Sequence, residues 1–276
     1  MNTPQPLLEV SDLSIDYVNG RRKVRVVKDV NFTIQRGQTL GLVGESGSGK
    51  STIGRALLGL VPAAEGSMMF DGTQLAGLGR KNRQQLSRRI QVIFQDPYSS
   101  LDITKTIGYT LAEPLRQHTK ISKAELEERV KAMLERVGLP PEAAERYPAQ
   151  FSGGQRQRIA IARALIGEPD FVVCDEPVSA LDLSIQAEVM NLLAKLQRSM
   201  GLSLLFISHD LSVVRHISDE LVVLRRGVIV EHGPAETVYA NPQHEYTRAL
   251  LDASPVPNPE EQALRRARRQ ALASAK

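Results

Sequence analysis

The stretch TLGLVGESGSGKSTIGRALLGL, residues 39–60, decides the fold. It opens as a short continuous apolar run, which is typical of a parallel strand buried on both faces. GESGSGKS follows at 44–51, a Gly-x-x-x-x-Gly-Lys-Ser loop, and TIGRALLGL then reads as a helix. In this setting the glycines turn backbone N–H groups toward phosphates, the lysine reaches the β and γ phosphates, and the serine hydroxyl ligates magnesium. The pattern predicts binding of a nucleoside triphosphate by Gly44, Glu45, Ser46, Gly47, Ser48, Gly49, Lys50, Ser51 and Thr52.

Two later apolar runs resemble the first one. FVVCDE at 171–176 and LSLLFIS at 202–208 are short and continuous, and both end in polar residues. In a doubly wound sheet, ligands bind at the carboxyl ends of such strands, so these polar ends are expected to share one crevice. Asp175 suits a magnesium ligand there, and Glu176 suits a group that orients or deprotonates an attacking water. The fold class predicted is α/β, a P-loop NTPase with a mixed parallel sheet.

The regions around this core have a different character. Residues 7–43 read as two strands joined at Asn19-Gly20, which predicts an N-terminal antiparallel β-subdomain. Residues 97–150 read as an inserted α-helical subdomain. In it, Ser122 and Glu125 form a candidate capping box, and Gly138 ends the helix. LVVLRRGVIVEHG suggests a further hairpin around Arg226-Gly227.

Composition narrows the class of protein. The chain has 276 residues with 42% hydrophobic and 24% charged, which is a globular balance that argues against extensive disorder. One cysteine, Cys174, allows neither an intrachain disulfide nor a cysteine metal site and favours a reducing compartment. No signal peptide or membrane span is found, so the chain is expected to be soluble. The net charge of +4 comes from 35 basic and 31 acidic residues, too mild an excess to indicate nucleic acid, which is not expected as a partner.

FSGGQRQRIAIARAL at 151–165 adds a second anion site, because a Ser-Gly-Gly-Gln turn opens a long helix. At this point the sequence resembles the ATP-binding cassette family, whose signature is Leu-Ser-Gly-Gly-Gln; Phe151 takes the leucine position. The resemblance covers nearly the whole chain, in the family's order. The resemblance implies that Tyr17 stacks on adenine, that Gln95 is the Q-loop glutamine and that His209 is the switch histidine. It implies a signature formed by Ser152, Gly153, Gly154 and Gln155. It also implies a D-loop formed by Ser179, Ala180, Leu181 and Asp182.

The resemblance also implies a mechanism. Two cassettes pair head to tail, and each ATP lies between the phosphate loop of one and the signature of the other. Magnesium is then held by Ser51, Gln95 and Asp175. The catalytic residues implied are Glu176 as general base, with His209, Gln95 and Lys50. Hydrolysis removes the γ-phosphate that holds the dimer closed.

The cassette motifs do not by themselves show which process the ATP hydrolysis powers. One hypothesis is the ATPase subunit of a bacterial importer at the cytoplasmic face of the cell membrane. It would pair with a second cassette and two integral membrane permease subunits, and indirectly with an extracytoplasmic solute-binding protein. The alternative is a soluble cassette ATPase acting on DNA or ribosomes, although such proteins usually carry two cassettes or long insertions. A GTPase is disfavoured because Asp-x-x-Gly and Asn-Lys-x-Asp motifs are missing.

The C-terminal part of the sequence favours the importer hypothesis and indicates a class of cargo. VYANPQHEYTRALLDASP at 238–255 resembles the corresponding segment of ATPases from the peptide and nickel importer group. Peptides are the expected cargo, with nickel or another small solute as the alternative. The domain boundaries expected are 7–96 with 151–235 for the ATP-binding core, 97–150 for the helical subdomain, and 236–276 for a C-terminal extension whose basic end is expected to form a solvated helix.

Overall fold

The computed structural model describes residues 5–20, 22–96, 101–118 and 121–253. The chain divides into two compact units, each built from segments distant in sequence. The first unit comprises Met1–Leu8, Ile34–Gln38 and Met69–Leu205, and the second comprises Glu9–Thr33, Thr39–Met68 and Phe206–Lys276. The expected basic end of the chain, and Pro97 to Ser100 at the start of the helical segment, lie outside the described residues.

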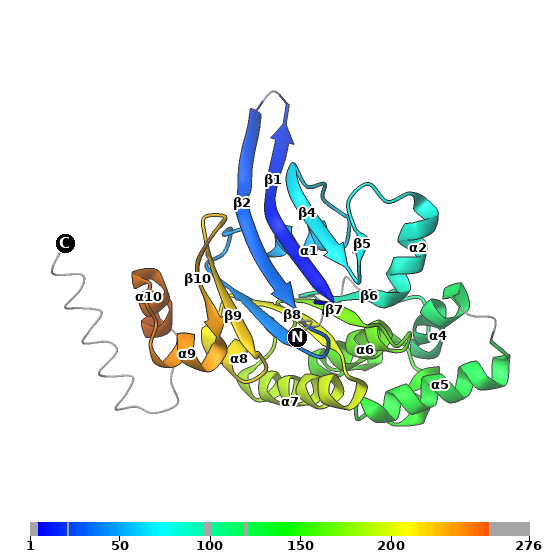
Figure 1. Ribbon diagram of the computed structural model, residues 1–276. Helices are drawn as coiled ribbons and strands as arrows, with labels where there is room; N and C mark the ends of the chain where they lie inside the picture. The colour runs from blue at the N-terminus through cyan, green and yellow to red at the C-terminus, as the bar shows by residue number, and fades with distance from the viewer. Residues whose placement is uncertain (1–4, 21, 97–100, 119–120, 254–276) are drawn as a thin grey trace. The chain divides into compact units, whose positions relative to one another are not determined.

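The N-terminal strands of the second unit form the antiparallel part predicted from the sequence. β1 (Leu8–Asn19) and β2 (Arg22–Ile34) lie side by side and run in opposite directions, with Gly20 at the turn (Figure 1). β4 (Glu65–Phe70) follows on the other side of β1. Val27, Val30 and Phe32 of β2 are buried and the residues between them are exposed, with the alternation interrupted at Asp29, which has a φ of 46°.

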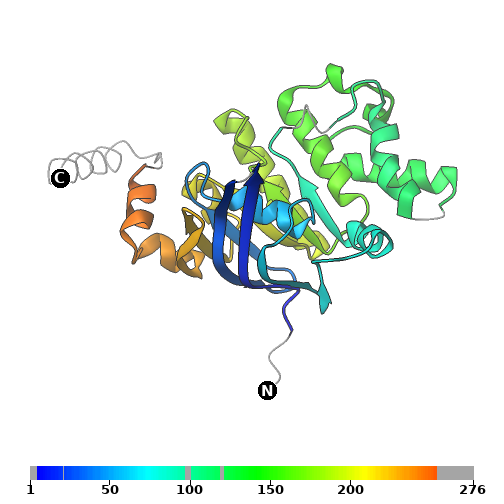
Figure 2. The ribbon, with the colours of Figure 1, turned by 90° about the horizontal axis from the view of Figure 1, so that it is seen from above.

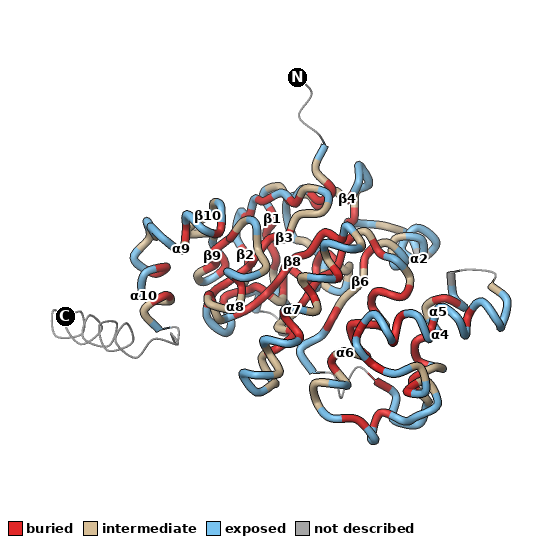
Figure 3. The backbone as a smooth tube through the Cα atoms, turned by 90° about the horizontal axis from the view of Figure 1, so that it is seen from below, coloured by how far each residue is buried: buried red, intermediate tan, exposed pale blue. Residues whose placement is uncertain are grey.

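The second unit also holds the strand that precedes the phosphate loop. β3 (Thr39–Val43) is buried along its whole length and pairs in parallel with β9 (Glu220–Arg225). β9 then pairs antiparallel with β10 (Val228–Pro234), so the hairpin predicted at Arg226-Gly227 is confirmed. Figure 3 shows β3 and β9 as mostly red, buried segments. Among its described residues, this unit has the helices α1 (Lys50–Leu57), α8 (Leu211–Arg215), α9 (Ala235–Ala240) and α10 (Glu245–Ala253).

The first unit contains the other buried parallel strands. β6 (Ile90–Ile93) pairs in parallel with β7 (Phe171–Asp175), and β8 (Ser203–Ser208) begins beside the start of β7 through a Ser203 N–H bond to Asp170 O of 3.1 Å. β8 crosses the division between the units, since Phe206–Ser208 belong to the second. Besides the helices between β6 and β7, this unit contains β5 (Thr73–Gln74), α2 (Arg80–Arg89) and α7 (Leu183–Met200).

Helices occupy the segment between β6 and β7. α4 (Ile107–His118) and α5 (Lys123–Arg136) lead through short 3-10 turns, η1 (Pro141–Glu145) and η2 (Pro148–Gln150), to α6 (Gly153–Leu165). These helices lie together, as Figure 2 shows in green. Ser122 caps α5 as expected, with its hydroxyl accepting from the Glu125 N–H at 3.2 Å, but the Glu125 carboxylate pairs with Arg129 and does not close a capping box.

Candidate functional site

The phosphate loop leaves β3 at Gly44 and enters α1 at Lys50. Gly49 is the N-cap of α1 with a φ of 108°, a left-handed conformation that favours glycine. No acidic residue lies in the first turn of α1, and no side chain caps it. The first amides of a helix have no partner within it, and they carry the positive end of its dipole. The local structure therefore presents an anion site.

Lys50 is 4% exposed, although its side chain carries a positive charge. Its ammonium donates to the carbonyl oxygens of Gly44 and Glu45, each at 2.8 Å. The Ser48 N–H also donates to the Glu45 oxygen at 3.1 Å. These bonds fold the loop around the lysine, because a buried ammonium needs acceptors to replace water.

The β9–β10 hairpin holds the loop from outside. The Gly227 N–H donates to the Ser48 oxygen at 2.9 Å, and the Lys28 N–H of β2 donates to the Gly227 oxygen at 2.8 Å. Three elements distant in sequence thus meet through backbone bonds. The hydroxyl of Tyr246, on α10, accepts from the Glu45 N–H at 2.9 Å.

The predicted carboxylates lie in the first unit, at one edge of its parallel strands. Ile93 pairs with Cys174, so Gln95 follows β6 at the same edge where Asp175 ends β7 and Glu176 follows. Glu176 has a φ of 49°, a left-handed conformation uncommon for a side chain with a Cβ and frequent at functional sites. Its carbonyl oxygen accepts from the amide of Ser179 at 3.3 Å and from the Ser179 hydroxyl at 3.1 Å. The predicted D-loop, Ser179 to Asp182, is thereby tied to Glu176 and runs into α7 with Asp182 as N-cap.

The signature residues open α6, also in the first unit. Ser152 is the N-cap, its hydroxyl accepting from the Gln155 N–H at 3.3 Å, and the Gln155 side chain accepts from the Ser152 N–H at 3.0 Å. This capping box was missed in the sequence, although Ser-x-x-Gln is its signature. A Cβ on Gly154 would lie 2.5 Å from Ile185 of α7, so packing also requires glycine at this position. Gly153 lies beside it in the first turn.

Tyr17 and His209 lie in the second unit. Tyr17 is on β1 and 40% exposed, and His209 directly follows β8 and is exposed. Next to Tyr17 an ion-pair network joins the strands. Arg25 binds Asp16 at 3.0 Å and Glu65 at 2.6 Å, while Lys23 binds Asp16 at 2.9 Å. The hydrogen bonds from Arg25 and then from Lys23 lower the pKa of Asp16 to about 2.

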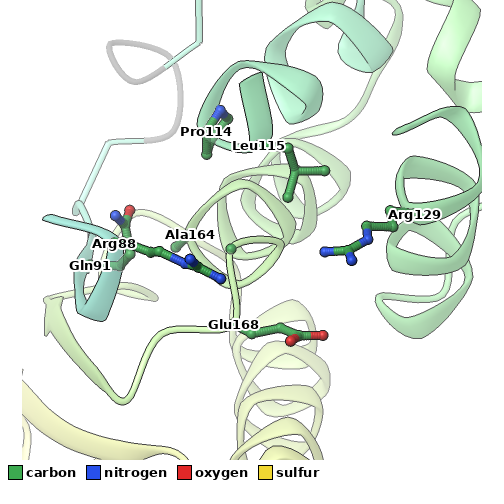
Figure 4. A pocket seen from close by; sticks show the side chains of 8 residues that line it. Arg88, Gln91, Pro114, Leu115, Arg129, Ala164 and Glu168 are labelled. Atoms are coloured by element: carbon green, nitrogen blue, oxygen red, sulfur yellow. The ribbon is translucent and has the colours of Figure 1, made fainter. Parts of the chain in front are cut away.

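The first unit also contains a pocket. It is lined by Arg88, Gln91, Pro114, Leu115, Arg129, Ala164, Gly167 and Glu168 (Figure 4). None of its lining residues was predicted as part of the site.

Over the ranges described, three or more His, Cys, Asp or Glu side chains nowhere group closely enough to hold a metal ion. Within the same ranges, every helix is too short or too polar to cross a membrane.

Comparisons with known proteins show the family of the chain. Residues 27–179 match the family model described as ABC transporter, and residues 230–276 match that described as oligopeptide/dipeptide transporter, C-terminal region. The oligopeptide transport ATP-binding protein AmiF of Streptococcus pneumoniae is 51% identical over 259 residues, covering 92% of this chain and 83% of AmiF. The oligopeptide transport ATP-binding protein OppF of Escherichia coli is 52% identical over 264 residues, covering 92% of this chain and 79% of OppF.

Solved structures show the same fold. CbiO1 of Clostridium perfringens, described as part of the ABC transporter complex CbiONQ, superposes with a TM-score of 0.77 at 28% identity, over 86% of this chain and 91% of that one. The ATP-binding cassette MJ0796, solved as a dimer bound to ADP and Pi, gives 0.75 at 28% identity, over 83% of this chain and 98% of that one. Because the first family model spans more than half of the chain and the relatives exceed 50% identity, the chain belongs to the ABC transporter family.

Proposed function

We propose that the chain is the ATP-hydrolysing subunit of an importer that powers the uptake of peptides through separate transmembrane subunits. The observation that carries this proposal is the match of residues 230–276 to the C-terminal region of oligopeptide/dipeptide transporters. AmiF and OppF, named as oligopeptide transport proteins, align with 92% of the chain, including its ATP-binding part. This support favours peptides over nickel as cargo, and a transporter over a machine acting on DNA or ribosomes.

ATP binds at the phosphate loop in this proposal. The amides at the start of α1 donate to phosphate oxygens, and Lys50 offers its charge to the β and γ phosphates. Tyr17 stacks on adenine, for which its 40% exposure leaves ring surface available. The bonds from Lys50 to Gly44 and Glu45 support this role, since they preorganise the loop around a cation.

Magnesium is proposed to be held by Ser51, Gln95 and Asp175. Their donor set fits this ion, because a hydroxyl, an amide oxygen and a carboxylate are the hard oxygen ligands that magnesium prefers. When bound, the ion neutralises charge on the phosphates. The chain's own part is to supply these oxygens from the loop and from the ends of β6 and β7.

Hydrolysis requires a water aligned with the γ-phosphate. Glu176 accepts a proton from this water, His209 contacts the γ-phosphate, and Gln95 contacts the water or the metal. The left-handed backbone of Glu176, held at its carbonyl oxygen by Ser179, supports an assigned role, since such strain persists where surrounding bonds enforce it.

The working state is a head-to-tail pair of cassettes. Each signature, Ser152 to Gln155, faces the ATP on the phosphate loop of the partner, and the D-loop, Ser179 to Asp182, follows the same interface. The dimeric MJ0796 cassette, at 28% identity, supports pairing. The capping box leaves α6 with an ordered, positive N-terminus suited to a phosphate.

The membrane partners are two permease subunits, with a solute-binding protein acting on the other side. The division proposed assigns 7–96 and 151–235 to the ATP-binding core, 97–150 to the helical subdomain that contacts the permeases, and 236–276 to the C-terminal extension. The chain then lies at the cytoplasmic face of the membrane. AmiF and OppF, as transport ATP-binding proteins, support this placement.

Two substitutions test the chemistry. Glu176→Gln is expected to bind ATP with wild-type affinity, to lower turnover at least about 100-fold, and to accumulate as an ATP-bound dimer measurable by light scattering. Lys50→Ala is expected to weaken ATP binding by about tenfold or more, because it removes a cation from the phosphates. Normal hydrolysis by Glu176→Gln would exclude Glu176 as the base, and unchanged ATP affinity of Lys50→Ala would exclude the loop.

Uptake in the host tests the cargo. A strain lacking the gene is compared for uptake of labelled di- to pentapeptides and of nickel, then complemented with the wild type or with Glu176→Gln. Peptide uptake restored only by the wild type supports the proposal. Restored nickel uptake with unaffected peptide uptake would contradict the cargo, and co-purification with ribosomes or DNA enzymes in place of membrane proteins would contradict the transporter itself.

A further inference from the structure

The hydroxyl of Tyr246 touches the phosphate loop, although 201 positions separate Tyr246 from its partner Glu45. It accepts a hydrogen bond from the Glu45 N–H at 2.9 Å, and the whole residue is only 5% exposed. Tyr246 lies on α10, within the segment that matches the oligopeptide/dipeptide transporter C-terminal region. A residue from this segment is therefore part of the loop's immediate surroundings.

The Glu45 N–H and the Gly44 carbonyl belong to one peptide unit. Because that unit is planar and trans, its N–H and C=O point in opposite directions. Lys50 holds the carbonyl at 2.8 Å, and Tyr246 holds the N–H at 2.9 Å. The two side chains therefore bind opposite edges of one peptide plane. Rotation of this plane would break both bonds and release the Lys50 ammonium from one of its acceptors.

Tyr246 is itself held firmly. Its backbone N–H donates to His244 Nδ1 at 3.0 Å, and the Arg225 guanidinium lies 4.9 Å from its ring centroid. Glu231 of β10 accepts from the amides of Gln243 and His244, at 2.7 and 3.0 Å, just before α10 begins. The position of the hydroxyl is thus set by β9, β10 and α10 together.

We propose that Tyr246 is a positioning residue of the phosphate loop, through which the C-terminal segment sets the affinity for nucleotide. This inference rests on the proposed role of the loop in binding ATP. It assigns to α10 a part in the nucleotide site beyond packing on its own unit.

The test replaces Tyr246 by Phe in the full chain and measures ATP binding by titration calorimetry and hydrolysis by phosphate release. The ring and its arginine contact remain, and only the acceptor is lost. We expect the Kd and KM for ATP to rise about five- to tenfold, with kcat and the number of sites close to wild type. A purely structural role would instead lower the number of competent sites at an unchanged Kd.

Tyr239→Phe is the matched control. Tyr239 lies on α9 of the same segment, and the Arg215 guanidinium lies 4.1 Å from its ring centroid, so the same atom is removed beside a similar arginine contact. We expect no change in Kd or KM for this variant. Equal effects of the two substitutions, or none from Tyr246→Phe, would overturn the proposal.

A double-mutant cycle isolates the bond. Glu45→Pro removes the N–H itself, so Tyr246→Phe should cause no further rise in Kd in the Glu45→Pro protein. A rise as large as in the wild type would overturn the proposal. If Glu45→Pro does not fold, the comparison of Tyr246→Phe with Tyr239→Phe decides alone. Lys50→Ala distinguishes a failure of the proposed ATP site from a failure of the role of Tyr246. Unchanged ATP affinity of Lys50→Ala would refute the loop assignment. Weakened ATP binding by Lys50→Ala, together with no effect of Tyr246→Phe, would refute only the role of Tyr246.

Discussion

Gly227→Ala should disturb the phosphate loop from a residue outside it. Gly227 has a φ of 83°, and a Cβ at this position would lie 2.1 Å from the Val26 oxygen and 2.9 Å from the Val26 carbonyl carbon. Both atoms are backbone, so a side-chain rotation cannot relieve the overlap. The hairpin must move instead, and the Gly227 N–H bond to the Ser48 oxygen moves with it.

The magnitude follows from two contributions. The left-handed conformation destabilises a residue with a Cβ by about 1 kcal/mol or more. Forcing an extra methyl group against packed atoms destabilises the folded state by roughly 1–3 kcal/mol. We therefore expect the free energy of unfolding to fall by about 3 kcal/mol, which corresponds to roughly 6–12 °C in Tm for a chain of this size. ATP affinity should fall as well, because the displaced hairpin no longer holds Ser48.

Two quantities are measured for each variant. One is the Tm without and with saturating ATP, and the other is the Kd for ATP, obtained by titration. Gly77→Ala is the matched control, since Gly77 has a φ of 72° and no atom within 4 Å of its Cβ position. It should lose only the conformational contribution of about 1 kcal/mol and keep its ATP affinity. If Gly227→Ala unfolds no earlier than Gly77→Ala, the steric argument is wrong; if it unfolds earlier but binds ATP normally, the hairpin does not support the loop.

Two further predictions follow from ionisable groups. The pKa of Asp16 is lowered to about 2 by Arg25 and Lys23, below its value of about 3.9 in an unfolded chain; its contribution to stability is therefore full above about pH 4 and is lost as the pH falls toward 2. The free energy of unfolding, measured with urea at pH 6, 4 and 3, should differ less between wild type and Asp16→Asn as the pH falls. A difference that stays constant would count against this ion pair. Burial raises the pKa of the Cys174 thiol to about 12, so a disulfide reagent at pH 8 should label it only after unfolding by urea; rapid labelling of the native chain would show that the strand opens.

Much of the fold was predictable because its elements carry local signals. The continuous apolar runs at 39–44, 171–176 and 202–208 became β3, β7 and β8, and the Arg226-Gly227 dipeptide became the turn between β9 and β10. Ser122 capped α5 where expected, but Glu125 paired with Arg129, because an arginine four residues along a helix competes with the helix end for a carboxylate. The roles assigned to the site residues, and the domain boundaries, stay predictions.

The sequence by itself determined the phosphate loop, the paired carboxylates, the signature and their order, since each depends on residue types at fixed short spacing. Only the tertiary structure decided which distant groups complete the loop. Tyr246 lies in the segment whose pattern resembled importer ATPases, but no local pattern predicted its bond to the loop, because its hydroxyl meets the Glu45 amide only after β9, β10 and α10 have packed. Likewise, glycine at 227 is required by a carbonyl of β2 close to its Cβ position, and glycine at 154 by Ile185 of α7. Such contacts arise from packing between segments far apart in the chain, which no local pattern records.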